Sequence, residues 1–437
     1  MGVNTADAYL NEVLVHVRWK RAHGIIRREL ADHISDAQRS FLEKGIAEDE
    51  AERLAVLEMG DAAEIGARFD AAYRPPKNYG VWIPFAAVVL MGFFLRSYAA
   101  GCVELSVFTL LAPAAFFGMC FLRFDRLVKL AWPIYGVYLL AAVLVHFMPA
   151  LRFAVYMPIL FPVLYALLIY RTRGRGLSGI LLLGAAFAAQ MLALLNAIPF
   201  NLAVLALVCL FELFYAVLSG WFSCKKRLAM LVILIPTAIF CLFAVGTFFY
   251  SFERRFITIF PNLNPYLDNY CDGLVSEILG KALWLGATTD TYTFSERVRT
   301  SLFERSDGFF ANDYLLVWLS ARLGRIVLVV VGGLFAAFFA FLFRACAKQQ
   351  STLYRLTSLG ITLNLFTQFM GYFLANLGLS AFFTYPLPFV SDGNAAMLCN
   401  AALMGLLFSM LRSGALMDDE PAKKYPRWRL KLVKEEM

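Results

Sequence analysis

Apolar runs of about the length of a membrane-spanning helix fill the sequence from Gly80 onward. A helix needs roughly 20 mainly apolar residues to cross the hydrocarbon core of a bilayer. Hydrophobic residues make up 60% of the 437 residues and the mean hydropathy is +0.65, well above the balance of a soluble domain. The sequence therefore predicts an all-α, polytopic membrane protein with about ten transmembrane helices. The predicted spans lie near residues 80–96, 103–121, 129–148, 153–170, 177–195, 198–219, 228–249, 314–343, 356–376 and 392–411.

Basic residues gather in every second connection between the predicted spans. Cytoplasmic loops of membrane proteins carry an excess of Lys and Arg, so this alternation predicts that both termini lie in the cytoplasm. The formal net charge of +8 is accordingly interpreted as a topology signal and not as affinity for nucleic acid. The basic residues are Arg123, Arg126 and Lys129, then Arg171, Arg173 and Arg175, then Lys225, Lys226 and Arg227, then Arg344, Lys348 and Arg355, and in the tail Lys423, Lys424, Arg427, Arg429 and Lys431.

Residues 1–78 form a separate, polar module of predicted helices. An apolar face with spacings of three and four residues precedes Gly45, which interrupts the helical pattern. Gly60 interrupts it again, and Asp61 with Glu64 has the form of a capping box that starts another helix. The string REL-DHI-D, followed by a glycine turn, an EA-rich helix and MGD, resembles the helical prefix domain found ahead of some bacterial permeases. We predict a cytoplasmic helical bundle without chemistry, with partner docking or regulation as the alternative.

The rest of the chain divides into a membrane domain and a tail. Residues 79–415 are predicted to form the transmembrane domain, with one long extracellular loop at 251–312. Residues 416–437 are predicted to form a basic cytoplasmic tail. The apolar run at 314–343 is too long for one straight crossing, so its first part is predicted to form a helix at or above the outer face.

The segment from Gln368 to Arg412 joins two apolar runs through a short loop that contains Pro386, Pro388 and Gly393. A helix cannot continue through Pro-Leu-Pro, and unpaired backbone is costly in lipid, so this loop is predicted to lie at a membrane face or to line a protein cavity. The segment resembles the signature Q-x-x-x-x-x-x-x-N-x-G-L and P-L-P-F-x-S-Y-G-G-S-S of the SEDS (shape, elongation, division and sporulation; FtsW/RodA/SpoVE) family. The matching residues are Gln368, Asn376, Gly378, Leu379, Pro386, Leu387, Pro388, Phe389, Ser391 and Gly393.

This resemblance implies the fold and the activity of a peptidoglycan glycosyltransferase. Such a protein polymerises lipid II at the outer face of the bacterial cytoplasmic membrane, in cell division, in the elongation that sets cell shape, or in sporulation. The resemblance further implies undecaprenyl diphosphate as the leaving group. It implies a class B penicillin-binding protein, which is a transpeptidase, as the partner in cell wall biogenesis.

A second family string, roughly H-T-D-F-I-F-A-V-x-x-E-E-x-G, resembles residues 307–324. Asn312, Asp313 and Tyr314 fit T-D-F, so the family's catalytic aspartate falls on Asp313. A sugar 4-hydroxyl is a poor nucleophile, and a carboxylate at the mouth of a low-dielectric cavity can take its proton in the transition state. An aspartate just before an apolar run is also an ordinary helix N-cap, and the two roles are compatible.

Arginines of the long loop are candidates for binding the pyrophosphate, because their planar forks suit phosphate oxygens. The alternative is that they anchor lipid headgroups. Acidic residues of the same loop are candidates for holding a divalent cation, Mg²⁺ or Mn²⁺, as a cofactor. The alternative is that these acids are simply solvated. The arginines are Arg254, Arg255, Arg297 and Arg299, and the acids are Glu296, Glu304 and Asp307.

Four further residues are candidates for lining the substrate cavity. Gln368 and Asn376 are eight residues apart and therefore lie on nearly one helix face, with interhelical hydrogen bonding as the alternative role. Ser391 and Asp392 follow the proline loop, and Asp392 replaces the tyrosine of the family signature. The alternative for Asp392 is a solvated turn.

The resemblance is partial at the site itself. The family's S-Y-G-G-S-S has become the string from Ser391 to Ala396, and the acidic pair after the catalytic segment has become Ala321-Arg322. These departures favour, as an alternative, a catalytically impaired SEDS-like scaffold of the division or sporulation machinery. A transporter of lipid-linked precursors is ranked last, because transport calls for polar residues at the membrane midplane and this chain has few. Those few are Gln190, Asn196, Asn201 and Glu212.

Overall fold

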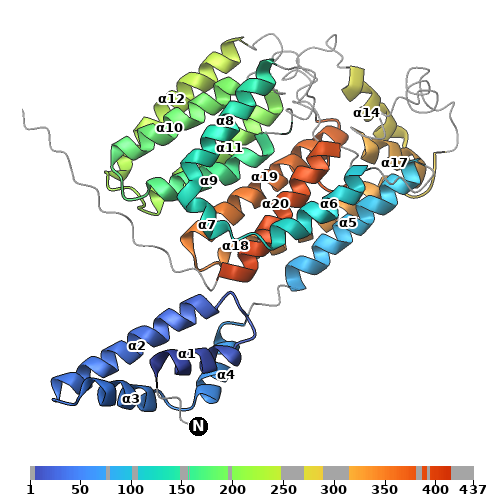
Figure 1. Ribbon diagram of the computed structural model, residues 1–437. Helices are drawn as coiled ribbons and strands as arrows, with labels where there is room; N and C mark the ends of the chain where they lie inside the picture. The colour runs from blue at the N-terminus through green and yellow to red at the C-terminus, as the bar shows by residue number, and fades with distance from the viewer. Residues whose placement is uncertain are drawn as a thin grey trace, which may run out of the picture. The chain divides into compact units, whose positions relative to one another are not determined.

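The computed structural model describes ten stretches of the chain, and every regular element within them is a helix. Two compact units divide at Lys77–Asn78, and they are described separately (Figure 1). The described residues are 5–74, 79–100, 107–147, 156, 158–194, 199–247, 270–288, 314–379, 386–390 and 394–414.

Four helices make up the first unit. Ile26, Leu30 and Ile34 follow one another at spacings of four residues along the second helix and are all buried in the core of this unit, as the spacing predicts. The fourth helix starts at the predicted capping residue, since the Asp61 carboxylate accepts a hydrogen bond of 3.1 Å from the backbone N–H of Glu64. The helices are α1 (Ala6–Val15), α2 (His23–Glu43), α3 (Glu48–Met59) and α4 (Ala62–Ala72).

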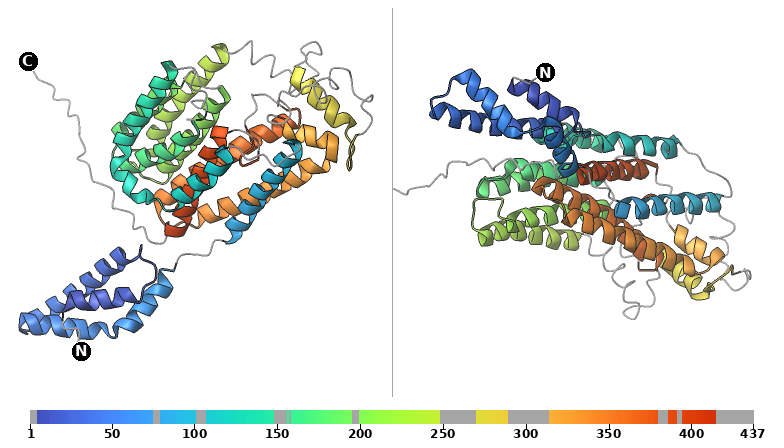
Figure 2. Two further views of the ribbon diagram at one scale, coloured as in Figure 1. Left: turned by 45° about the vertical axis from the view of Figure 1, so that its right-hand side comes forward. Right: turned by 90° about the horizontal axis from the view of Figure 1, so that it is seen from below.

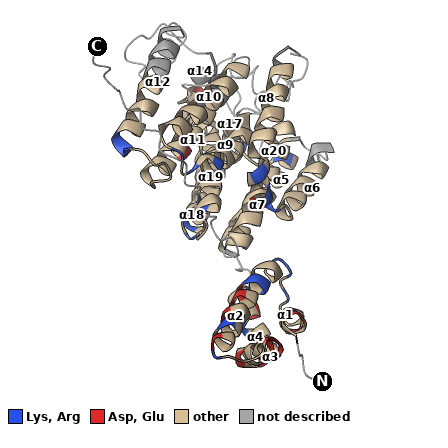
Figure 3. Ribbon diagram, turned by 60° about the vertical axis from the view of Figure 1, so that its left-hand side comes forward, with Lys and Arg blue, Asp and Glu red and all other residues tan. Residues whose placement is uncertain are grey.

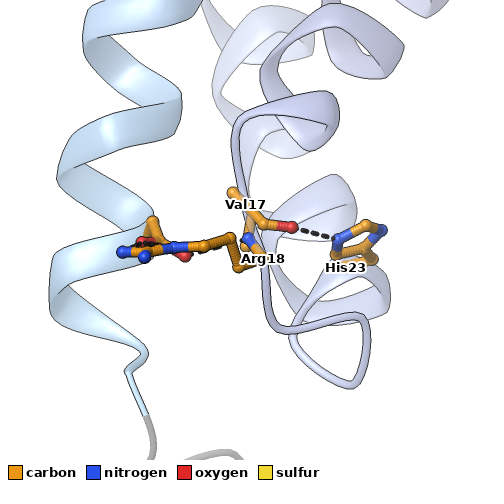
Figure 4. Close-up of polar contacts among 4 residues, drawn as sticks. Val17, Arg18 and His23 are labelled. Carbon is orange, nitrogen blue, oxygen red and sulfur yellow. Dashed lines mark hydrogen bonds and ion pairs between the residues drawn. The ribbon is translucent and has the colours of Figure 1, made fainter.

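Surface polar contacts fix the connection between α1 and α2. The Arg18 guanidinium donates to the Asp70 carboxylate of α4 at 2.6 and 2.9 Å, and the backbone N–H of Arg18 donates to the same carboxylate at 2.9 Å (Figure 4). The Arg18 side chain thereby lowers the pKa of Asp70 below its usual value. His23 Nε2 lies 2.8 Å from the carbonyl oxygen of Val17 and ties the connection to the start of α2.

The second unit contains a helix at each of the ten predicted apolar runs. The run predicted at 103–121 is helical from Val107, and residues 101–106 lie outside the described ranges. The helices are α5 (Tyr79–Ala100), α6 (Val107–Cys120), α7 (Phe124–Leu127), η1 (Val128–Leu130), α8 (Ala131–Phe147), α9 (Phe161–Thr172), α10 (Leu177–Ala193), α11 (Pro199–Leu218), α12 (Lys226–Thr247), α14 (Tyr270–Lys281), α17 (Leu315–Leu323), α18 (Ile326–Ala347), α19 (Thr352–Asn376) and α20 (Asn394–Ser413).

The eighth apolar run is broken into α17 and α18 at Gly324. This residue has φ of +101°, a conformation that side chains with a Cβ rarely adopt. A Cβ at this position would also lie only 2.6 Å from the carbonyl oxygen of Trp284. The break explains why the run is too long for a single crossing, since Leu315–Leu323 near its start form the separate helix α17.

The centre of the second unit is α19, which is polar for a helix so deeply buried. It packs against α9 and α11 on one side and against α18 and α17 on the other. The long helices of this unit lie alongside one another (Figure 2). Because protein and not lipid surrounds α19, Asn364, Gln368 and Asn376 can form hydrogen bonds with neighbouring segments. The buried polar residues of α19 are Thr357, Ser358, Thr362, Asn364, Gln368 and Asn376.

The outer surface of the second unit is apolar. Large hydrophobic side chains such as Leu90, Phe94 and Val137 are exposed, and charges are sparse compared with the first unit (Figure 3). Four helices of the described part are long and apolar enough to cross a membrane, and four shorter apolar helices accompany them. The second unit is therefore that of a multi-pass membrane protein. The four long segments are Gly80–Ala99, Phe124–Val145, Ile326–Ala347 and Ala395–Ser413, and the shorter ones are Leu110–Cys120, Pro158–Thr172, Leu177–Ala193 and Leu205–Leu218.

Candidate functional site

The helix α17 begins at Leu315, two residues after Asp313 in the sequence, and side chains of α19 hold its first turn. The backbone N–H of Leu315 donates to the Tyr372 hydroxyl at 3.1 Å, and that of Val317 donates to Asn376 Oδ1 at 3.3 Å. The first turn of a helix has N–H groups without a partner in the helix. Here another helix satisfies two of them. The N-cap position belongs to Tyr314, whose side chain makes no capping hydrogen bond.

Asn376 is itself held in a fixed orientation. Its Nδ2 donates to the carbonyl oxygen of Tyr372 one turn earlier at 3.0 Å, which leaves Oδ1 to accept from α17. Asn376 and Tyr372 are both fully buried. A buried amide with satisfied donors and acceptors is rigid, because any other rotamer loses hydrogen bonds that water cannot replace. The sequence-based alternative for Asn376, interhelical hydrogen bonding, therefore describes its contacts in the structure.

An apolar cluster locks α17 between α14 and α19. Its buried members from α17 and the residue before it are Tyr314, Val317 and Ala321. The segment that follows α14 is bonded to the far end of α17, since the N–H of Gly286 donates to the carbonyl oxygen of Leu323 at 3.1 Å. The start of α17 is thus fixed on several sides. The remaining buried members of the cluster are Val275, Ile278 and Ala375.

The position of the family's acidic pair carries no acid in this chain. Ala321 is buried in the cluster around α17, and the Arg322 guanidinium lies 4.6 Å from the centre of the Trp318 ring in a cation–π contact. The nearby Arg325 donates through Nη2 to the carbonyl oxygen of Gly280 at 2.7 Å. This end of α17 is therefore cationic and apolar, and neither Ala321 nor Arg322 is a ligand for a divalent cation.

Gln368 belongs to a second, separate polar cluster on α19. It exchanges hydrogen bonds with Asn400 of α20, at 3.0 Å from Asn400 Nδ2 to Gln368 Oε1 and 3.3 Å in the other direction. Gln368 Nε2 also approaches Asn364 Oδ1 at 3.1 Å, and Asn364 Nδ2 donates to the carbonyl oxygen of Ile159 at 2.6 Å. The three amides connect α19 to α20 and to Ile159, which lies just before α9.

Gln368 and Asn376 are not brought together into one site. Eight residues of helix separate their backbones by about 12 Å along the axis of α19. Each has its own partners, and both side chains are fully buried. In the described part of the chain, Gln368 fixes α20 and Asn376 fixes α17.

The proline loop packs against α5 in a strained conformation. Phe389 has φ of +66°, which is rare for a residue with a side chain and costs of order 1–3 kcal/mol. Its ring lies 5.3 Å from that of Phe85, and a Cβ at Gly92 would lie 3.0 Å from Val390 Cα. Glycine at position 92 therefore allows the loop backbone to lie directly on α5.

Most of the predicted site residues lie outside the described ranges, so their predictions stand as made. Within the described ranges, no group of three or more His, Cys, Asp or Glu residues is arranged to hold a metal ion. The predicted residues outside the described ranges are Asp313, Arg254, Arg255, Arg297, Arg299, Ser391 and Asp392, together with the loop acids Glu296, Glu304 and Asp307.

The sequence analysis missed three residues that complete these clusters. Asn364 and Tyr372 each lie four residues before a predicted site residue on the same helix face, and this spacing was a usable signal. Asn400 is an isolated amide in an apolar run, which is a weaker signal of an interhelical hydrogen bond.

Comparison with known proteins gives structural similarity without sequence similarity. No protein-family model and no curated protein matches the sequence. The fold is similar to that of one chain in a solved structure. That structure is described as showing the structural coordination of polymerization and crosslinking by a peptidoglycan synthase complex. That match has 18% identity and a TM-score of 0.55, and it covers 77% of this chain and 97% of the other. At this identity the similarity shows a shared fold.

Two structures of the rod shape determining protein RodA from Thermus thermophilus, one wild type and one an aspartate-to-alanine mutant, also match. Each has 18% identity and a TM-score of 0.48, over 77% of this chain and 97% of the other. None of these matches supports the resemblance of the N-terminal module to permease prefix domains.

Proposed function

We propose that this protein is a SEDS-type peptidoglycan glycosyltransferase that polymerises lipid II at the outer face of the bacterial cytoplasmic membrane. The observation that carries the proposal is the fold shared with a chain of a peptidoglycan synthase complex, over 97% of that chain. A shared fold alone does not fix function, so the argument needs a site as well. The site is the segment that ends at Asp313 and continues into α17.

In the proposed reaction, the 4-hydroxyl of one sugar attacks the anomeric carbon of a polyprenyl-diphosphate-linked donor. Asp313 takes the hydroxyl proton while the new C–O bond forms, and the bond from the anomeric carbon to the phosphate oxygen breaks. Undecaprenyl diphosphate leaves with the electron pair of that bond. The hydrogen bonds from α17 to Tyr372 and Asn376 support this role, because they fix the helix that begins two residues after the proposed base.

Negative charge on the leaving diphosphate requires neutralisation, which the proposal assigns to the loop arginines Arg254, Arg255, Arg297 and Arg299. A divalent cation beside the diphosphate would add to that neutralisation, and the acids proposed to hold it are Glu296, Glu304 and Asp307. No described residue at the end of α17 contributes a ligand, since Ala321 and Arg322 stand there. The proposed cavity residues are Gln368, Asn376, Ser391 and Asp392.

The proposed setting follows from the same resemblance. About ten transmembrane helices with both termini in the cytoplasm would place the 251–312 loop outside the cell. A class B penicillin-binding protein is the proposed partner, because glycan strands need crosslinking once they are polymerised. The proposed processes are cell division, cell elongation and sporulation.

A lipid II polymerisation assay with the purified protein tests the proposal. We expect wild type to form glycan strands, and Asp313→Asn to be slower by about 100-fold or more, as loss of a general base usually costs. The matched control is Asp125→Asn, which removes a carboxylate paired with Arg123 near the predicted cytoplasmic face. Equal rates for wild type and Asp313→Asn contradict the assignment.

A second candidate function, a non-enzymatic scaffold, is favoured by one observation. The buried Ala321 and the Trp318-bound Arg322 replace the acidic pair that active relatives are expected to carry. If the protein is a scaffold, cells carrying Asp313→Ala grow and divide normally, whereas cells lacking residues 1–78 do not. The opposite pattern rules the scaffold out.

A further inference from the structure

A single carboxylate lies in the middle of an apolar membrane helix, and the proposed reaction does not use it. Glu212 occupies α11, within the sequence VCLFELFYAVL, and its side chain is fully buried. An ionisable residue at this depth is costly unless it is paired or neutral. It therefore requires an explanation beyond packing.

The Glu212 carboxyl has no protein partner among the described residues. Both of its oxygens are inaccessible to solvent and without a hydrogen bond there, and none of the ion pairs between described residues includes it. An ionised carboxylate normally accepts several hydrogen bonds. The surroundings of Glu212 are those of a neutral group.

The carboxyl points at the backbone of α19. A Cβ added at Gly360 would overlap Glu212 Oε1 and lie 3.0 Å from Cδ, so glycine at position 360 makes room for the acid. α11 and α19 pack side by side over this contact. The close approach fixes the carboxyl against one helix instead of leaving it free to reach solvent.

A second polar group beside this contact also lacks a partner. Thr357 lies one turn before Gly360 on α19, is fully buried, and its hydroxyl has no hydrogen bond among the described residues. Thr362 and Thr367 of the same helix instead donate to carbonyl oxygens one turn earlier, at 2.8 and 2.9 Å. Glu212 of α11 and Thr357 of α19 are thus two buried polar groups on packed helices that lack hydrogen-bond partners among the described residues.

The charged groups on the helices packed around α11 are engaged elsewhere or lie near helix ends. Lys226 at the start of α12 donates to the carbonyl oxygen of Leu218 at 2.6 Å, and Arg355 near the start of α19 donates to that of Gln349 at 3.0 Å. Two titratable side chains interact electrostatically with Glu212, namely Tyr165 of α9 and Cys209 of α11. Both are neutral groups under ordinary conditions. The remaining charged groups of these helices are Arg171 of α9 and Arg227 of α12.

We propose that Glu212 is an intramembrane proton-binding site, which holds its proton in the native protein. A bound proton removes the charge, which carries most of the cost of burying an unpaired carboxylate, and it turns the carboxyl into a hydrogen-bond donor. The inference is independent of the proposed glycosyltransferase activity, since the infrared measurement that tests it does not use lipid II.

Infrared difference spectroscopy on the full-length protein tests the protonation directly. Wild type is expected to show the carbonyl stretching band of a protonated carboxylic acid, and Glu212→Gln is expected to lack it. Glu277→Gln is the matched control, because that partly exposed carboxylate pairs with Lys281 at 2.9 Å and should be ionised. Identical wild-type and Glu212→Gln spectra in this band overturn the proposal.

Discussion

The N-terminal unit and the membrane unit both use polar side chains to hold one helix against another, but they place them differently. In the first unit the Arg18–Asp70 pair lies at the surface, where the Arg18 side chain is 77% exposed. In the second unit the Gln368–Asn400 and Asn376–α17 contacts are fully buried. Water competes for the first kind of contact and not for the second. Breaking a polar contact should therefore lower the free energy of unfolding less in the first unit than in the second.

Close helix packing at a glycine occurs in both units, since a Cβ added at Gly66 of α4 would lie 2.7 Å from the carbonyl oxygen of Val13. In the membrane unit, Gly405 of α20 lies so close to α6 that an added Cβ would be 2.9 Å from the carbonyl carbon of Phe116. In the N-terminal unit, Gly24 of α2 has open space around the same position. The membrane helices pack through small residues, as is usual where apolar surfaces gain little by leaving lipid.

The largest effect is expected from Gly405→Ala. The added methyl must displace the backbone of α6, so we expect a loss of about 3 kcal/mol in the free energy of unfolding. Gly24→Ala is the matched control in the other unit and should be neutral or stabilising by up to about 1 kcal/mol. Thermal unfolding of the two variants in detergent measures the difference. Equal melting temperatures would show that the contact of α20 with α6 does not require glycine at position 405.

A smaller loss, about 2 kcal/mol, is expected from Gln368→Leu. This substitution leaves the Asn400 amide buried without its reciprocal partner, which costs the desolvation of that group. The double variant Gln368→Leu/Asn400→Leu removes both partners and should recover part of the loss. A double-mutant cycle on unfolding free energies checks this, and strictly additive losses would show that the two amides are not coupled.

Tyr372→Phe should cost about 1 kcal/mol, close to the loss of a helix cap. The variant keeps the ring and removes only the hydroxyl that accepts from the N–H of Leu315. Hydrogen exchange of residues 315–323 should become faster while exchange in α20 stays unchanged. Unaltered exchange in α17 would mean that α19 does not cap it.

The smallest effect is expected at the Arg18–Asp70 pair. The pKa of Asp70 is lowered in the folded protein by its hydrogen bond from Arg18, so its contribution is present at neutral pH. That contribution should be lost as the pH falls through the folded-state pKa, below about 4. Hydrogen exchange of α4 in the full chain, compared between wild type and Asp70→Asn across pH, checks the sign. A difference that grows at low pH would contradict it.

The parts of the fold that depend on local pattern were predictable. Apolar runs gave the helices of the membrane unit, and the excess length of the eighth run anticipated the break that the structure places at Gly324. The helix face of Ile26, Leu30 and Ile34 and the capping role of Asp61 follow from spacing alone. Each of these features is decided within a few turns of chain.

Contacts between distant segments were not predictable in the same way. Hydrogen bonding was foreseen as an alternative for Gln368 and Asn376, but their partners are 32 and 59 residues away in the sequence. Glycine at position 360 leaves room for the Glu212 carboxyl, and only the packing of α11 on α19 shows that the two residues are in contact. Helix order in a bundle, and hence the pairing of polar groups, is not encoded in local periodicity.

The most direct test of the proposed activity is the rate at which purified protein converts lipid II to glycan strands. Wild type and Asp125→Asn are predicted to polymerise lipid II at similar rates, and Asp313→Asn is predicted to retain about 1% of that rate or less. Polymerisation by Asp313→Asn at the wild-type rate, or none by a folded wild-type protein supplied with its transpeptidase partner, would contradict the account.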